Sequence, residues 1–239
     1  MKIDAANMYF ETLNNQVRCT RDAEIEIDRC YGQRFIGAGS RDKHIVINGT
    51  PGNALGCYMN GTVIDVHGNA QDAIGDTMND GAIRVYGDAG DACGYAMRGG
   101  KIYVKGSAGY RTGIHMKEYR DKKPVIVIGN EVGSFFGEYQ AGGILVVLGM
   151  QSEKKAPVGY YCAVGMHGGK MYIRCDELPK LPEQVIAHRA TEEEMAEIRG
   201  NLEEFCSIFD YSAEDVYAKP FYVLTPNTNN PYKSLYTPN

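Results

Sequence analysis

Hydrophobic and polar positions alternate over short stretches in the central part of the chain. Three of these stretches share the pattern Ile-x-Val, at residues 64–66, 83–85 and 102–104. Alternation of this kind predicts a half-buried β-strand, because successive side chains of a strand point to opposite faces. Equivalent residues of the three stretches are 19 positions apart, so strand should follow strand at a fixed interval.

The same period places glycine and methionine. One glycine series and one methionine series advance in 19-residue steps, and a second glycine series does so before it is stretched near residue 120. We expect the glycines to form corners, where the backbone needs φ > 0 or close approach to a neighbour. The expected corners are Gly37, Gly56, Gly75, Gly94, Gly113, Gly49, Gly68, Gly87, Gly106, Gly129 and Gly149. The expected core ladder is Met59, Met78, Met97, Met116, Ile64, Ile83, Ile102, Val66, Val85 and Val104.

A unit of this length is too short for a strand, a substantial helix and two turns. Its second half, GxxGxxxG, is also too rich in glycine to be helical, since each internal glycine costs about 1 kcal/mol relative to alanine. Stacked units would therefore be all-β, with equivalent residues about 4.8 Å apart. The sequence predicts a right-handed parallel β-helix, a single-stranded solenoid of about seven coils, over residues 29–177.

Short α-helical caps are expected at both ends, because an open stack exposes unpaired backbone. Residues 1–28 form the predicted N-terminal cap, in which Asp4 caps a helix bearing Leu13 and Val17. Residues 178–239 form a predicted C-terminal helical extension and tail. There Thr191 and Glu194 make a capping box. The apolar stripe of the helix that follows is Met195, Ile198, Leu202, Phe205 and Phe209.

A second short helix is expected where Ser212 and Asp215 supply a start signal and Pro220 a stop. Beyond Pro226 the sequence has no periodicity, and either an ordered arm laid on a partner or a mobile tail fits it.

Composition narrows the class of protein. The net charge is −5, which argues against a binder of nucleic acid. The longest apolar run, residues 142–149, is far shorter than the ~20 residues that span a bilayer, so no membrane contact is expected. The N-terminus lacks the pattern of a signal peptide. Seven scattered cysteines without a CxxC pair predict reduced thiols in a cytoplasmic protein.

Candidate chemistry is sparse. GDAGDACG and GSAGYRTG resemble phosphate-binding loops, but no amphipathic helix follows them and the pattern recurs in every unit. The histidines (His67, His115 and His167 among them) have no partner at metal-ligand spacing. We therefore expect no catalytic, cofactor-binding or metal-ligating residue in this chain. Tyr86, Tyr103 and Tyr172 should point outward, where either a protein interface or stacking between coils would use them.

These repeated motifs resemble the GXGXG β-helix family. The resemblance covers about residues 30–175 and rests on units such as GDAGDACGYAMRGGKIYVKG at residues 87–106. That family forms the C-terminal domain of the glutamate synthase large (alpha) subunit and is related to the C-type subunit of formylmethanofuran dehydrogenase. Residues 190–232 resemble the extension of free-standing glutamate synthase subunits.

The resemblance implies a non-catalytic structural subunit of a multi-chain glutamate synthase. It implies glutaminase and synthase subunits as partners, with FMN and an iron–sulfur cluster in those partners and no cofactor in this chain. A homo-oligomer is compatible with the same features. One alternative is a scaffold like the C-type subunit in a formylmethanofuran dehydrogenase-type complex. A stand-alone carbohydrate-active β-helix enzyme ranks last, because Asp72, Asp76, Asp88 and Asp91 lie in turns without a repeated ladder.

Overall fold

The computed structural model describes residues 1–227, which form eleven strands and three helices. The strands are β1 (Lys2–Asp4), β2 (Glu24–Tyr31), β3 (His44–Thr50), β4 (Asn60–His67), β5 (Asp80–Val85), β6 (Lys101–Val104), β7 (Val125–Ile128), β8 (Ala141–Val147), β9 (Gly168–Arg174), β10 (Val185–Arg189) and β11 (Phe221–Pro226). The helices are α1 (Phe10–Cys19), α2 (Glu192–Phe209) and α3 (Ala213–Tyr217).

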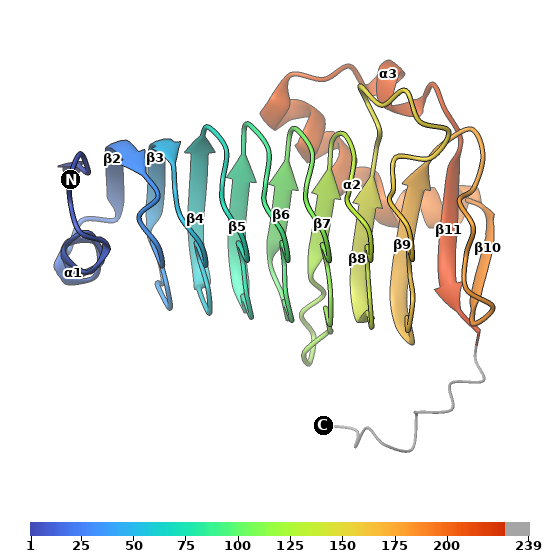
Figure 1. Ribbon diagram of the computed structural model, residues 1–239, viewed down its shortest axis with the longest axis horizontal. Helices are drawn as coiled ribbons and strands as arrows, with labels where there is room; N and C mark the ends of the chain where they lie inside the picture. The colour runs from blue at the N-terminus through green and yellow to red at the C-terminus, as the bar shows by residue number, and fades with distance from the viewer. Residues whose placement is uncertain (228–239) are drawn as a thin grey trace.

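All eleven strands belong to one sheet, in the order β1-β2-β3-β4-β5-β6-β7-β8-β9-β11-β10 (Figure 1). Strands β1 to β9 are parallel, each paired with the next along the chain. Strand β11 then adds antiparallel to β9, and β10 pairs antiparallel with β11. Strands β1 and β10 are consequently the two edges of the sheet.

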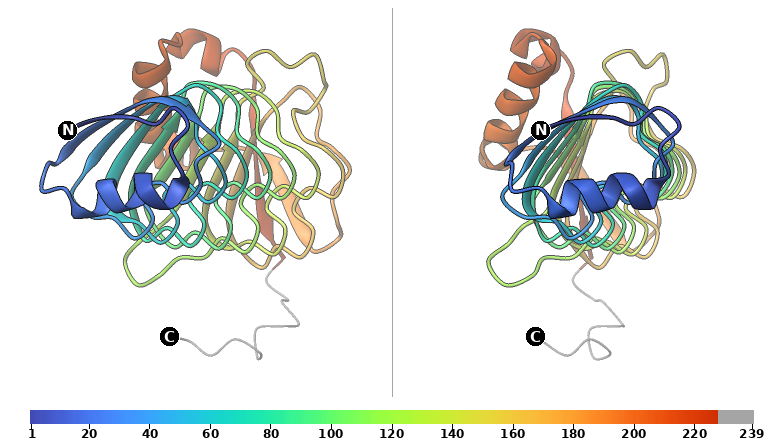
Figure 2. Two further views of the ribbon diagram at one scale, coloured as in Figure 1. Left: turned by 60° about the vertical axis from the view of Figure 1, so that its left-hand side comes forward. Right: turned by 90° about the vertical axis from the view of Figure 1, so that its left-hand side faces the viewer.

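The segments between consecutive strands from β2 to β9, called the return segments below, leave the sheet on one side and rejoin it at the next strand (Figure 2). They consist mainly of turns and contain no helix. Single residues pair between neighbouring return segments, as in the row Ala70, Ala89, Ala108 and Val132, but these contacts are isolated bridges. Each 19-residue period therefore contributes one strand, and every strand joins the same sheet.

This arrangement corrects the predicted fold class. The expectation of an all-β, right-handed parallel β-helix of about seven coils is wrong, because the chain forms one large open sheet, mostly parallel, with a strand–helix pattern of the α/β kind. The glycine-rich halves supply turns where strands were expected. Residues 178–226 also supply two antiparallel strands and an 18-residue helix, which the period did not reveal.

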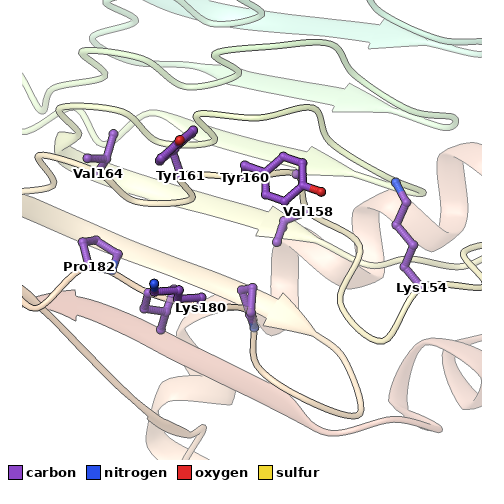
Figure 3. Close-up of a pocket in the computed structure, with 10 residues that line it drawn as sticks. Lys154, Val158, Tyr160, Tyr161, Val164, Lys180 and Pro182 are labelled. Atoms are coloured by element: carbon purple, nitrogen blue, oxygen red, sulfur yellow. The ribbon is translucent and has the colours of Figure 1, made fainter.

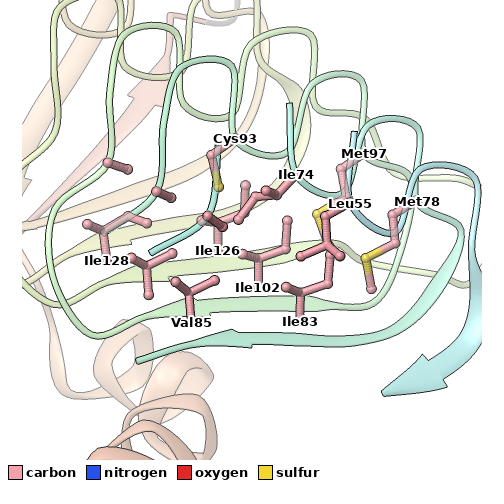
Figure 4. Close-up of a cluster of buried hydrophobic side chains, with 14 of the residues drawn as sticks. Leu55, Ile74, Met78, Ile83, Val85, Cys93, Met97, Ile102, Ile126 and Ile128 are labelled. Atoms are coloured by element: carbon pink, nitrogen blue, oxygen red, sulfur yellow. The ribbon is translucent and has the colours of Figure 1, made fainter. Parts of the chain in front are cut away.

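One face of the sheet packs against the return segments and forms the main core (Figure 4). Ile64, Ile83 and Ile102 are register partners on neighbouring strands, and Val66, Val85 and Val104 repeat two residues later. Ile126 and Leu145 extend the first row into β7 and β8. Aligned β-branched side chains of this kind pack well on a pleated surface.

The other face is covered by α2 over strands β6 to β9, as Figure 2 shows. Ile198, Leu202, Phe205 and Phe209 of this helix are buried. They pack on sheet residues such as Val127, and strand β7 (VIVI) is buried throughout. A strand covered on both faces reads as a continuous apolar run, which explains why β7 does not alternate. The predicted capping box of Thr191 and Glu194 is confirmed.

Separate segments close the two ends of the main core. Helix α1 buries Leu13 and Val17 at the N-terminal end, as predicted, but its N-cap is Tyr9. Asp4 lies instead in β1, where its carboxylate pairs with Arg29, so the expected cap at Asp4 is wrong. At the C-terminal end, residues near Leu178, Leu181 and Val185 pack against the core.

Helix α3 begins after Ser212, as predicted, but the Ser212 hydroxyl accepts a hydrogen bond from the backbone N–H of Glu214 rather than Asp215. The tail beyond Pro226 lies outside the described residues from position 228 onward.

Candidate interaction site

The residues expected at corners and in the core occupy defined places. Gly37, Gly56, Gly75, Gly94 and Gly113 have φ between 65° and 74°. Gly49, Gly68 and Gly149 also have positive φ. Gly87, Gly106 and Gly129 do not, but a Cβ at each would lie 2.2 Å from an oxygen of the preceding unit. The methionines, isoleucines and valines of the expected ladder, from Met59 to Met116, are all 0% exposed.

A row of side-chain oxygens along the return segments was missed in the sequence. The Asp72 Oδ1 atom accepts a hydrogen bond from the backbone N–H of Asp91 at 2.9 Å, and the Asp91 Oδ1 atom accepts one from Tyr110 at 2.8 Å. A parallel row runs from Asn69 through Asp88 to Ser107. These acids thus form a ladder 19 residues in step, contrary to the expectation that they had none.

The signal for this ladder is present in the sequence, because Asp72 and Asp91 are one period apart. Reading these carboxylates only as catalytic acids hides it. In the structure their oxygens bind backbone N–H groups of the next return segment, which is the role of Asx side chains in turns.

The tyrosines expected to face outward are covered by this chain itself. Tyr103 and Tyr172 are 0% exposed beneath α2. The Tyr103 hydroxyl donates to Glu204 at 2.9 Å, and the Tyr172 hydroxyl donates to Glu197 at 3.1 Å. Tyr86 packs edge-on against Phe209, with ring centroids 5.1 Å apart. Neither open alternative for these rings was right, because the period gave no sign that α2 would cover them.

Charges between α2 and the sheet are paired. Glu197 receives Lys123 at 2.8 Å and Lys170 at 2.6 Å, in addition to Tyr172. Burial by itself would raise the pKa of Glu197, but the hydrogen bonds from the two lysines and Tyr172 outweigh it and lower that pKa to about 2. This cluster fixes the helix on the sheet and leaves no free acid or base there.

Two columns of left-handed residues run along the outside of the return segments. The first left-handed column is Phe35, Ala54, Ala73, Ala92, Arg111, Phe135 and Tyr161, and the second is Tyr58, Thr77, Ala96, His115 and Tyr139. All have φ between 49° and 64°, although none is glycine. From Ala54 to Phe135, and along the whole second column, each backbone N–H donates to a carbonyl of the following return segment, which holds the strained conformation.

Toward the C-terminal end, these columns carry exposed aromatic and cationic side chains. The Arg111 guanidinium lies 5.2 Å from the centroid of the Phe135 ring, which stacks on Tyr161 at 5.0 Å. In the second column, the His115 ring stacks on Tyr139 at 5.2 Å. We call the surface made by Tyr95, Tyr110, Arg111, His115, Phe135, Tyr139, Tyr160 and Tyr161 the aromatic face.

A pocket of 690 Å³ adjoins the aromatic face (Figure 3). Val158, Tyr160, Tyr161 and Val164 line it from the last return segment. The opposite wall is the segment 179–182. Tyr160 is 81% exposed and Tyr161 65% exposed, so two large rings stand at a hollow with apolar walls.

Thiol and metal chemistry find little support in the described part of the chain. Burial raises the pKa of Cys93 and of Cys162 to about 12, so neither is a thiolate at neutral pH. Cys57 is likewise buried, as expected. No group of three or more potential metal ligands occurs within residues 1–227. No helix in that range is long and apolar enough to cross a membrane.

Comparison with known proteins identifies relatives of the whole chain. The GXGXG motif family model matches residues 9–225. The uncharacterized protein MJ1350 of Methanocaldococcus jannaschii is 43% identical over 252 aligned positions, which cover 99% of this chain and 96% of that protein. The match extends through α2 and the antiparallel strands, beyond the glycine-rich units. The chain therefore belongs to the GXGXG motif family.

Proposed function

We propose that this protein is a non-catalytic structural subunit of a multi-chain glutamate synthase, in which it docks glutaminase and FMN-containing synthase polypeptides. Membership of the GXGXG motif family supports this, since that domain also occurs in the C-terminal region of the glutamate synthase large subunit. The observation that carries the proposal on this chain is the aromatic face, an exposed group of six aromatic rings, His115 and Arg111 on a rigid frame.

The composition of this face suits protein binding. Tyrosine and arginine are enriched at the centres of protein interfaces, where a few residues contribute most of the binding free energy. Tyr95, Tyr110 and Tyr139 are 40%, 54% and 47% exposed, so much of each ring is available to a partner. Their backbones are fixed by hydrogen bonds between return segments, so little conformational entropy would be lost on docking.

The proposed role is architectural. Stacked return segments hold the aromatic face at a fixed distance from α2 and the sheet, and two partners bound to this frame would keep a constant relative position. In the proposed complex the partners supply FMN, the iron–sulfur cluster and the glutaminase nucleophile. The Asp72–Asp91 ladder engages backbone N–H groups, which favours a structural over a glycosidase role for these carboxylates.

The proposal is tested by recovering the tagged chain from the organism that encodes it. We expect a complex with the absorbance of a flavoprotein that forms glutamate from glutamine and 2-oxoglutarate, whereas the isolated chain is colourless and inactive. Recovery with molybdenum or tungsten proteins would replace this proposal with a formylmethanofuran dehydrogenase-type scaffold. Cleavage of a polysaccharide by the isolated chain would contradict both.

A further inference from the structure

The pocket beside the aromatic face lies close to the point where the described chain ends. The backbone N–H of Asn227 donates to the carbonyl of Gln184 at 2.7 Å, and Gln184 is two residues beyond Pro182 in the pocket wall. Two residues span at most about 7 Å. Whatever follows Asn227 therefore begins beside the pocket.

The walls of the pocket are chemically distinctive. Val158, Val164 and Leu181 present apolar surface, while Tyr160 and Tyr161 present two exposed rings. A volume of 690 Å³ falls within the range of about 300–1,000 Å³ that is typical of pockets for compact ligands. Apolar walls flanked by aromatic rings suit a short peptide that offers proline and aromatic side chains.

Lysines at the margin add to this specificity. Lys154 is paired with Glu131, but Lys180 has no ion-pair partner among residues 1–227. An ammonium group beside an apolar pocket favours an aromatic ring over a second cation.

The chain itself supplies a peptide of this composition. Residues 228–239 read TNNPYKSLYTPN, with apolar side chains at Tyr232, Leu235 and Tyr236 and prolines at 231 and 238. Five residues after Asn227 reach about 17 Å at roughly 3.4 Å per residue, so Tyr232 can enter a pocket whose wall begins about 7 Å away.

We propose that the segment 228–239 of this chain occupies the pocket between residues 158–164 and 179–182, with Tyr232, Leu235 and Tyr236 as its apolar anchors. This proposal stands independently of the glutamate synthase assignment, because it concerns the isolated chain. Occupancy would cover Tyr160 and Tyr161 and so set how much of the aromatic face is open to a partner.

The test uses the absence of tryptophan from this chain. A Tyr160→Trp substitution gives a single fluorescent reporter at the pocket in the full chain. A second protein also carries Tyr232→Ala, Leu235→Ala and Tyr236→Ala, and a matched control carries Asn229→Ala, Asn230→Ala and Ser234→Ala instead. The quantities measured are emission wavelength and quenching by acrylamide.

We expect the reporter with the native segment, and the matched control, to be quenched several-fold less than the protein lacking the three anchors, with emission at shorter wavelength. Equal quenching in all three proteins would overturn the proposal. Shielding that appears only as the protein dimerises, measured by sedimentation, would also overturn it, because the segment of a second copy would then be the occupant. Hydrogen exchange at residues 158–164 of the parent and the anchor variant, without tryptophan, gives the same comparison should the reporter disturb folding.

Discussion

The ladder of aspartate side chains along the return segments gives a sharp prediction about stability. Asp72→Ala removes the oxygen that accepts the backbone N–H of Asp91 at 2.9 Å. Asp72 is exposed, so water can replace part of this bond, and the loss should fall near the typical net value of about 1 kcal/mol. For a chain of this size that corresponds to a decrease in Tm of roughly 2–4 °C.

Asp72→Asn separates the hydrogen bond from the charge. The amide oxygen still accepts from Asp91, and the loss of one carboxylate reduces repulsion within a column where neighbours lie about 4.8 Å apart. We therefore expect this variant to match or slightly exceed the parent in stability. Glu153→Ala is the control for removing an exposed carboxylate elsewhere, and it should leave the Tm within about 1 °C.

Thermal unfolding followed by circular dichroism, with urea titration as a second measure, distinguishes the variants. The reasoning requires Asp72→Ala to fall below both Asp72→Asn and Glu153→Ala. If Asp72→Asn lost as much stability as Asp72→Ala, the charge and not the acceptor would matter, and the ladder would not be the source of the effect.

Three further predictions follow from the core, the charge cluster and the glycines. Phe205→Ala should lower the free energy of unfolding by about 3–5 kcal/mol in urea titration, because a 0% exposed ring is lost, whereas Glu203→Ala on the exposed side of α2 should change it little. Glu197 has a lowered pKa, so its stabilisation is present above its ordinary value of 4.5 and is lost as the pH falls toward about 2; Glu197→Gln should flatten the decline in Tm over that interval. Gly75→Val should abolish soluble expression, since φ is 66° and the new Cβ would lie 2.5 Å from the Ile102 side chain, while Gly200→Ala, with open space around it, should raise the Tm. Soluble Gly75→Val with the parent's Tm would contradict the geometry of the corner.

The sequence predicted local features better than their assembly. The period located Ile64, Ile83 and Ile102 on neighbouring strands, and these are register partners. The capping signal at Thr191 predicted the start of α2 correctly. Both features depend on residues close in sequence or related by one fixed interval.

Features that depend on contacts between distant segments were not predicted. The position of α2 over Tyr103 places residues about 100 positions apart in contact, and no periodic pattern encodes that. The fold class was wrong for a related reason, because pattern alone did not show that the glycine-rich halves form turns and leave one sheet. The left-handed conformation of Arg111 and Phe135 also escaped prediction, since neither residue type favours it.

The central claim is that the aromatic face binds the partner polypeptides. Arg111→Asn with Tyr139→Asn removes two side chains of the face while asparagine tolerates their left-handed backbone. Tyr31→Ser is the matched control, because Tyr31 is 90% exposed and lies outside the face. The measurement is the affinity of the purified partner flavoprotein for each variant, with the Tm of each variant as the check on folding.

We predict that the double variant binds roughly 30-fold or more weakly, equivalent to about 2 kcal/mol, while Tyr31→Ser binds as the parent does. Equal affinity of the parent and the double variant, at unchanged Tm, would contradict the account.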